Sequence, residues 1–216
     1  MSSPASLAVV ILAAGKGTRL KSKRPKVLHE IGGKPLLAHV IAAAGRVVAP
    51  EHIYVVIGHQ ADRVRAALAA TGVQFVEQTE QRGTGHAIQC ARASVAGYES
   101  LLVLSGDVPL IRAETIENMS RFHKAEHAAM TILSAQPDDP TGYGRIVRRA
   151  AGSPDVDAIV EQKSLAPGQE KIGEINSGIY AFKSAPLFAH LDQLTANNAH
   201  GELYLTDMAG ILRAAG

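Results

Sequence analysis

The first half of the chain alternates strand-like apolar runs with helical patterns, and this alternation restricts the fold more than any other feature. The run AVVILA at residues 8–13 is continuously apolar and rich in β-branched residues, as expected of a strand buried on both faces. The further strands that we predict cover residues 53–57, 73–76, 101–104 and 129–135, and the helices cover residues 36–47, 62–70, 84–95 and 112–127. Strands separated by helices favour a parallel sheet covered on both faces, so we predict an α/β fold with a doubly wound, mostly parallel sheet.

The pattern changes after Pro137. Pro140, Gly142 and Gly144 interrupt the chain, and no repeat of fixed period follows. Beyond them we predict strands at residues 145–149, 158–161 and 175–182 and helices at residues 185–194 and 205–214. We therefore expect a smaller mixed lobe, about residues 137–216, that is continuous with the sheet formed by about residues 7–136.

Composition excludes several classes of protein. Of the 216 residues, 46% are hydrophobic and 19% are charged, which is enough apolar mass for a core. The 22 basic and 20 acidic residues give a net charge of +2, so no nucleic-acid partner is expected. The one cysteine, Cys90, has no partner for an internal disulfide. Neither a signal-peptide pattern nor an apolar run of about 18 residues occurs, so we expect a cytoplasmic protein without a membrane partner.

Glycine and positive charge gather in the turn after the first predicted strand. Residues 13–19 read AAGKGTR, and six basic residues without an acidic one lie between Lys16 and Lys26. Ligands of doubly wound sheets bind at the carboxyl ends of strands, and glycines let backbone N–H groups approach an anion. The turn therefore predicts a phosphate site. The P-loop pattern is absent, and Leu20 replaces the third glycine of the dinucleotide fingerprint.

The turn resembles the signature L-x-x-G-x-G-T-R…P-K of the sugar-nucleotidyltransferases, which this chain matches with Leu12, Gly15, Gly17, Thr18, Arg19, Pro25 and Lys26. Further stretches are similar to uridylyltransferase domains that act on N-acetylglucosamine-1-phosphate. They are KVLH at 26–29, QTEQRGTGHA at 78–87, GDVPL at 106–110, DPTGYGRI at 139–146, IVEQK at 159–163, EINSGI at 174–179 and GELYLTD at 201–207. The resemblance covers nearly the whole chain and implies a Rossmann-like fold with a nucleotide-binding part (7–136) and a sugar-binding part (137–216).

The resemblance also implies a reaction. UMP is transferred from UTP to N-acetylglucosamine-1-phosphate, which gives pyrophosphate and UDP-N-acetylglucosamine for cell-wall precursor synthesis. Such transfer depends on positioning and charge neutralisation, and the family's catalytic cations correspond to Arg19 and Lys26. The family's ligand of Mg²⁺ corresponds to Asp107, a carboxylate directly after a predicted strand.

The same resemblance implies a set of substrate-binding residues. They are Leu12, Ala13, Ala14, Gly15, Lys26, Gln78, Gly83, Thr84, Ser105, Gly106, Asp107, Gly144, Glu161, Asn176, Tyr204 and Thr206. Gln78 belongs to the pyrimidine pocket, and Thr84 either caps the helix it begins or faces the ligand. Glu161 and Asn176 suit the hydroxyl and N-acetyl groups of a sugar. Ser105 departs from the tyrosine common in the family, and we expect Cys90 to be a core residue.

Two further features of the family lie in segments that, in the family, come after the part that matches this chain. One is an Asn that provides a second ligand to Mg²⁺, and the other is a β-helix acetyltransferase domain that builds the family's trimer. We therefore expect a monomer, either a fragment or a naturally short protein. Transfer to another sugar-1-phosphate, a non-catalytic sugar-nucleotide-binding module and a dinucleotide-binding oxidoreductase stay open as alternative functions.

Overall fold

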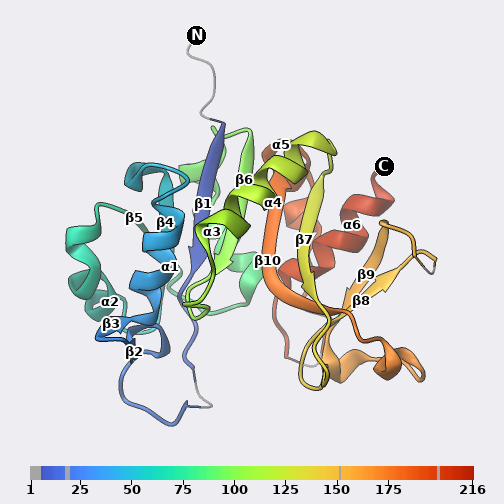
Figure 1. Ribbon diagram of the computed structural model, residues 1–216, viewed down its shortest axis with the longest axis horizontal. Helices are drawn as coiled ribbons and strands as arrows, with labels where there is room; N and C mark the ends of the chain where they lie inside the picture. Colours follow the sequence, from blue (N-terminus) through green and yellow to red (C-terminus); the bar gives the residue numbers. More distant parts are fainter. Residues whose placement is uncertain (1–5, 18–19, 151, 199) are drawn as a thin grey trace.

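The central element of the protein, in a computed structural model, is a mixed sheet with helices on both faces (Figure 1). The structure describes residues 6–17, 20–150, 152–198 and 200–216. Its strands are β1 (Leu7–Leu12), β2 (Glu30–Ile31), β3 (Lys34–Pro35), β4 (Ile53–Ile57), β5 (Gln74–Glu77), β6 (Ser100–Ser105), β7 (Met130–Ala135), β8 (Arg145–Arg148), β9 (Val156–Val160) and β10 (Ile175–Lys183). Its α-helices are α1 (Leu36–Ala44), α2 (Ala61–Leu68), α3 (Thr84–Val95), α4 (Ala113–Ala125), α5 (Ser184–His190) and α6 (Met208–Ala214).

One half of the sheet is parallel, in the order β5-β4-β1-β6. Its register places Leu12, the last residue of β1, beside Val56 of β4 and Ser105 of β6. The carboxyl ends of these strands therefore meet at one edge of the sheet, and the segments that follow them are brought together there.

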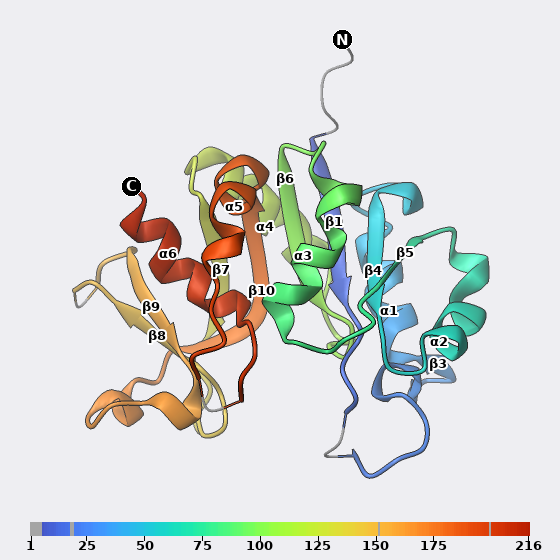
Figure 2. The ribbon, with the colours of Figure 1, turned by 180° about the vertical axis from the view of Figure 1, so that it is seen from behind.

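Alternate residues of the central strands face two separate cores. In β1, Ala8 and Val10 pack in one core, and Val9 and Ile11 pack in the other. The first core holds apolar residues of α3, α5 and α6, which cover one face in Figure 2, and the second holds those of α1, α2 and α4. Both faces of each central strand are thus buried, which explains why these strands read as continuous apolar runs.

The pairing of β7 differs from the prediction. The sequence predicted that this strand would extend the parallel sheet after α4, but β10 lies between β6 and β7 and is antiparallel to both. β10 fits this central place because Tyr180 and Phe182 face one core while Ile179 and Ala181 face the other. An apolar pattern shows that a strand is buried, but it does not identify the strand's neighbour.

The later strands join the same sheet through β10. β8 pairs with β9, and Arg145 of β8 is in register with Ile175 of β10. The predicted helix at 205–214 begins instead with a 3₁₀ turn, Leu205–Asp207, and continues as α6. Within the described ranges, every helix is too short or too polar to span a bilayer.

Phe182→Ala tests the contribution of β10 to the core. The Phe182 side chain is fully buried, so its removal should lower the free energy of unfolding by about 3–5 kcal/mol, measured by urea denaturation. Phe122→Ala is the matched control, because Phe122 on α4 is 56% exposed and its loss should change stability by less than about 0.5 kcal/mol. Equal effects at the two positions would show that β10 is not a structural element of the core.

Candidate active site

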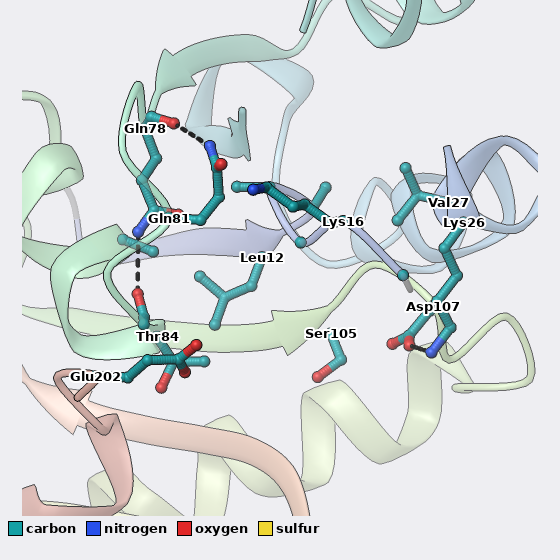
Figure 3. A pocket seen from close by; sticks show the side chains of 16 residues that line it. Leu12, Lys16, Lys26, Val27, Gln78, Gln81, Thr84, Ser105, Asp107 and Glu202 are labelled. Atoms are coloured by element: carbon teal, nitrogen blue, oxygen red, sulfur yellow. Dashed lines mark hydrogen bonds and ion pairs between the residues drawn. The ribbon is translucent and has the colours of Figure 1, made fainter. Parts of the chain in front are cut away.

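A cavity of about 550 Å³ opens at the carboxyl ends of β1 and β6, beside the first turn of α3 (Figure 3). Segments distant in the sequence contribute to its wall. The lining residues are Leu12, Ala13, Ala14, Gly15, Lys16, Gly17, Lys26, Val27, Gln78, Gln81, Gly83, Thr84, Ala87, Ser105, Asp107 and Glu202. The cavity therefore lies where a doubly wound sheet binds its ligands.

The segment after β1 is held by backbone hydrogen bonds to both neighbouring strands. Ala13 N–H donates to the carbonyl of Val56 (2.9 Å), and Gly106 N–H donates to the carbonyl of Leu12 (2.9 Å). A Cβ at Gly106 would lie 3.0 Å from the Leu12 carbonyl, so the two segments touch through their backbones. These contacts fix the start of the glycine-rich turn against the loop that carries Asp107.

Lys26 reaches the cavity through a short 3₁₀ turn, Lys26–Leu28, which is anchored by the buried side chains of Val27 and Leu28. Gly17 lies directly against it. Its φ of +60° favours glycine, and a Cβ there would lie 2.7 Å from the Lys26 Cβ. The sequence G-x-G-T-R…P-K thus brings its lysine back beside its second glycine. Arg19 and Thr18, the other functional residues of this signature, lie outside the described residues.

Lys26 and Asp107 form an ion pair at the cavity, as the dashed line in Figure 3 shows. The Lys26 side chain is 42% exposed and that of Asp107 is 30% exposed, so both groups are accessible from solvent. The resemblance assigned Lys26 to phosphate and Asp107 to a metal. The structure pairs them with each other.

A carboxylate in this position fits Mg²⁺. Mg²⁺ is usually held by one or two carboxylates, with waters and substrate phosphates as the remaining ligands. Asp107 provides one partly exposed carboxylate at the cavity wall, and no group of three or more His, Cys, Asp or Glu side chains capable of holding a metal gathers in the described part of the chain. As far as these side chains of the described residues are concerned, a metal at Asp107 would therefore take its other ligands from water and substrate oxygens.

Gln78 lies on the other side of the cavity and is only 3% exposed. Its Nε2 donates to the carbonyl of Gly83 (3.0 Å) and lies 3.1 Å from Nδ1 of His86. Nε2 of Gln81 donates to the backbone carbonyl of Gln78 (3.0 Å), and a Cβ at Gly58 would lie 2.7 Å from that same carbonyl. The amide of Gln78 is thus held in one orientation, which suits recognition of the polar edge of a base.

The first turn of α3 joins the C-terminal segment to the cavity. Thr84 lines the cavity, and its Oγ1 accepts a hydrogen bond from Leu205 N–H (3.0 Å). The N-terminus of α3 has no side-chain cap, because the residue before the helix is Gly83. Gly83 has a φ of +105°, and a Cβ there would lie 2.5 Å from the carbonyl of Leu203. This close packing brings Glu202 to the cavity wall.

A second group of predicted residues gathers beside β10. The Glu161 carboxylate oxygens lie 3.5 Å from the point where a Cβ of Gly144 would be, and Asn176 N–H donates to the carbonyl of Gly144 (2.9 Å). Ser105 Oγ donates to the carbonyl of Gly178 (3.4 Å), which connects this group to the cavity. Gly144, Glu161 and Asn176, which were predicted to bind sugar, therefore lie next to the cavity, although they do not line it.

The polar groups around Glu161 set its charge. Burial and the neighbouring Asp207 raise the pKa of Glu161, and the Thr206 hydroxyl partly offsets this by favouring the ionised form. Burial also raises the pKa of Tyr204, and Glu202 and Glu161 contribute further. The Asn176 amide already uses one of its donors, because its Nδ2 donates to the Tyr180 hydroxyl at 2.8 Å. The group is thus acidic and partly desolvated.

Glu161→Gln tests this charge. Because burial raises the pKa of Glu161 in the folded state, its ionisation destabilises the fold as the pH rises from the unfolded value of 4.5 through the folded value. The variant lacks this penalty, so its thermal midpoint should exceed that of the wild type by about 1–3 °C near pH 7.5 and match it below about pH 4. Glu117→Gln, on the exposed face of α4, is the control and should leave the midpoint unchanged. A lower midpoint for Glu161→Gln at neutral pH would contradict the prediction.

Some residues of the cavity wall were absent from the predicted binding set. Lys16 and Gly17 belong to the turn that the sequence predicts as a phosphate site, and Val27 and Gln81 belong to stretches that resemble the family. The folded chain places all four on the cavity wall. Glu202 lies in the stretch GELYLTD, and its sequence position alone indicated no role. Cys90, expected in the core, is partly exposed, and its Sγ lies 3.7 Å from Nε2 of His86.

Comparison with known proteins gives relatives over the whole chain. The bifunctional protein GlmU of Koribacter versatilis (strain Ellin345) is 62% identical over 216 residues, which cover all of this chain and 46% of that protein. The bifunctional protein GlmU of Solibacter usitatus (strain Ellin6076) is 49% identical over 214 residues, which cover 99% of this chain and 46% of that protein. The chain thus spans about half the length of the curated relatives it matches.

Solved structures share the fold. A crystal structure of UDP-glucose pyrophosphorylase complexed with UDP-glucose gives a TM-score of 0.72 at 18% identity, over 97% of this chain and 88% of that chain. A putative glucose-1-phosphate thymidylyltransferase from Bacillus anthracis gives a TM-score of 0.72 at 21% identity, over 98% of this chain and 84% of that chain. The predicted α/β fold is confirmed by this likeness, and the predicted parallel part of the sheet corresponds to the strands β5-β4-β1-β6.

The match to a family model agrees with the position of the cavity. The model of MobA-like NTP transferase domains matches residues 9–203, from β1 through the segment that contacts Gly83. That range includes every residue of the cavity wall given above. The resemblance to nucleotidyltransferases that the motifs indicated is therefore confirmed. The chain belongs to the family of MobA-like NTP transferase domains.

Proposed function

We propose that this domain transfers UMP from UTP to N-acetylglucosamine-1-phosphate in the presence of Mg²⁺. One observation carries the proposal: Lys26, Asp107 and the buried amide of Gln78 lie around one cavity at the carboxyl ends of β1 and β6. A cation, a carboxylate and a fixed amide match the three needs of a nucleoside triphosphate, which are charge neutralisation, a metal and recognition of the base.

The chemistry is an in-line displacement. A phosphate oxygen of the sugar-1-phosphate forms a bond to the α-phosphorus of UTP, the bond from that phosphorus to the bridging oxygen breaks, and pyrophosphate leaves. Negative charge develops on the oxygens around the α-phosphorus, and the Lys26 ammonium stabilises it as a mobile point charge. Arg19 has the same role by resemblance. Mg²⁺, held by Asp107 with substrate oxygens and water, supplies further charge neutralisation when bound.

Base and sugar occupy opposite ends of the site in this proposal. Gln78, with backbone around Leu12 to Gly15 and Gly83, takes the uracil, while Glu161 and Asn176 take the sugar hydroxyl and N-acetyl groups. Ser105, which contacts the carbonyl of Gly178, lies where the two ends meet.

The deciding experiment measures pyrophosphate release with UTP, Mg²⁺ and a panel of sugar-1-phosphates. N-acetylglucosamine-1-phosphate should give the highest kcat/KM, and CTP, dTTP and GTP should replace UTP poorly. A different preferred sugar would support transfer to another sugar-1-phosphate. Binding of UDP-N-acetylglucosamine without any pyrophosphate release would support a non-catalytic binding module, and NAD(P)H binding would support an oxidoreductase.

The cellular setting belongs to the same proposal. A role in cell-wall precursor synthesis places the domain in the cytoplasm, with UTP and the sugar phosphate as its small-molecule partners. The proposal also takes the chain as a monomer. Sedimentation equilibrium tests this last point, and a mass above that of one 22.7 kDa chain would contradict it.

A further inference from the structure

The ion pair between Lys26 and Asp107 joins two groups that the proposed reaction uses for different purposes. Lys26 is needed for the triphosphate, and Asp107 is needed for the divalent cation. Neither group can serve its own ligand fully while it neutralises the other. Full use of either group by its own ligand therefore weakens the contact between Lys26 and Asp107.

The neighbouring charges give the pair few substitutes. Arg24, which is close to Lys26 in sequence, is paired with Glu30. Lys16 and Glu202 are the other charged side chains on the described part of the cavity wall, and neither is paired with Lys26 or with Asp107. Among the described residues, Lys26 and Asp107 thus have only each other as ion-pair partners, and when they separate a ligand or water takes up their charges.

We infer that this ion pair makes the binding of the divalent cation and the binding of the triphosphate depend on each other. A cation alone that takes Asp107 leaves the Lys26 ammonium uncompensated next to a second positive charge. A triphosphate alone that takes Lys26 leaves the Asp107 carboxylate next to a polyanion. When both arrive together, each protein group exchanges one partner for another of the same sign, and no charge is left without a partner.

This inference rests on the proposed function, because it assumes a nucleotide and a metal at this cavity. It adds that Lys26 weakens binding of the divalent cation to the nucleotide-free protein, although Lys26 supports binding of the cation together with the triphosphate. It adds likewise that Asp107 weakens metal-free nucleotide binding. Both effects run opposite to what simple loss of a binding residue would give, and this makes them measurable.

The first test is a titration of the nucleotide-free protein with Mn²⁺, followed by electron paramagnetic resonance of the free ion. Lys26→Met should bind Mn²⁺ about 3- to 10-fold more tightly than the wild type, because the exposed pair is modest in strength and a nearby positive charge is also removed. The double variant Lys26→Met, Asp107→Asn should lose this gain. An unchanged or weaker Mn²⁺ affinity of Lys26→Met would overturn the inference.

A matched control separates the ion pair from the general field of the cavity. Lys16 also lines the cavity and forms no ion pair with Asp107 in the structure. Lys16→Met should therefore change Mn²⁺ affinity by less than about twofold. An equal gain from both lysine variants would attribute the effect to net charge and overturn the role of the pair.

The second test measures UTP binding by calorimetry in EDTA. Asp107→Asn should bind metal-free UTP about 3- to 10-fold more tightly than the wild type, and the gain in UTP affinity on adding Mg²⁺ should shrink. Weaker metal-free binding by Asp107→Asn would overturn the inference. Both side chains are partly exposed, so the variants should keep the wild-type thermal midpoint. If Lys26→Met lowers the thermal midpoint, Lys26→Gln takes its place in the binding tests.

The outcomes distinguish this inference from the proposed function. If the wild type with Mg²⁺ binds no nucleotide, the proposed function fails, and the Mn²⁺ titration still decides whether Lys26 restrains Asp107. If the wild type binds Mg²⁺ and UTP but Lys26→Met shows no gain in Mn²⁺ affinity, the inference alone fails.

Discussion

Lys26→Met is expected to lower kcat/KM for pyrophosphate release by about 10²–10³-fold, the usual cost of removing one group that stabilises charge in the transition state. The Lys26 ammonium lies at the cavity wall beside Gly17, and its stem begins a 3₁₀ turn whose anchors are Val27 and Leu28. The variant keeps the stem and removes the charge. Its stability should therefore stay close to that of the wild type, and the loss should appear mainly in kcat.

Lys34→Met is the matched control for this prediction. Lys34 is an exposed lysine in β3, and it is absent from the described cavity wall. Its replacement should leave kcat/KM within about twofold of the wild type. If Lys26→Met kept activity within about threefold, the assignment of Lys26 to the reacting phosphate would be wrong.

Asp107→Asn is expected to raise the Mg²⁺ concentration for half-maximal activity by at least about tenfold, and to lower kcat/KM at fixed Mg²⁺ by about 10²–10³-fold. The amide keeps the size of the side chain and an oxygen donor, but it loses the negative charge that Mg²⁺ prefers. High Mg²⁺ should restore part of the activity, because substrate phosphates provide other ligands. The measurement is a Mg²⁺ titration of pyrophosphate release at saturating UTP.

Asp138→Asn, in an exposed loop after β7, is the corresponding control and should show the wild-type Mg²⁺ titration. An unchanged titration for Asp107→Asn would remove Asp107 from the metal site. A lower activity that no Mg²⁺ concentration improves would instead indicate a role other than metal binding. The two variants at Lys26 and Asp107 thus separate the cation of the site from its carboxylate.

Much of the site follows from features that are local in the sequence. Residues Ala13 to Gly17 come directly after an apolar strand, and Asp107 follows a second one, so both were expected at the carboxyl edge of a parallel sheet. The structure places both at one cavity, because β1 and β6 are neighbours in register. Motif spacing also placed Lys26 near the turn, and the close contact between Gly17 and Lys26 gives the physical reason for that spacing.

Other features required the folded chain. Glu202 reaches the cavity because Leu203 packs against Gly83, and no property of the segment 201–207 by itself indicates that contact. The residues Gly144, Glu161 and Asn176 were expected at the same site, and the structure gathers them beside β10 instead of on the cavity wall. Arg19 lies outside the described residues, so its role as a catalytic cation stays a prediction from the sequence.

Local patterns in the chain were enough to define its elements: which runs are strands buried on both faces, which turn carries glycines and cations, and where carboxylates follow strands. These properties depend on residues close together in the chain, through backbone conformation and apolar periodicity. The entry of β10 between β6 and β7 and the pairing of Lys26 with Asp107 became apparent in the folded molecule alone. Such contacts depend on how distant segments pack around two shared cores, and no local pattern encodes which surfaces will meet.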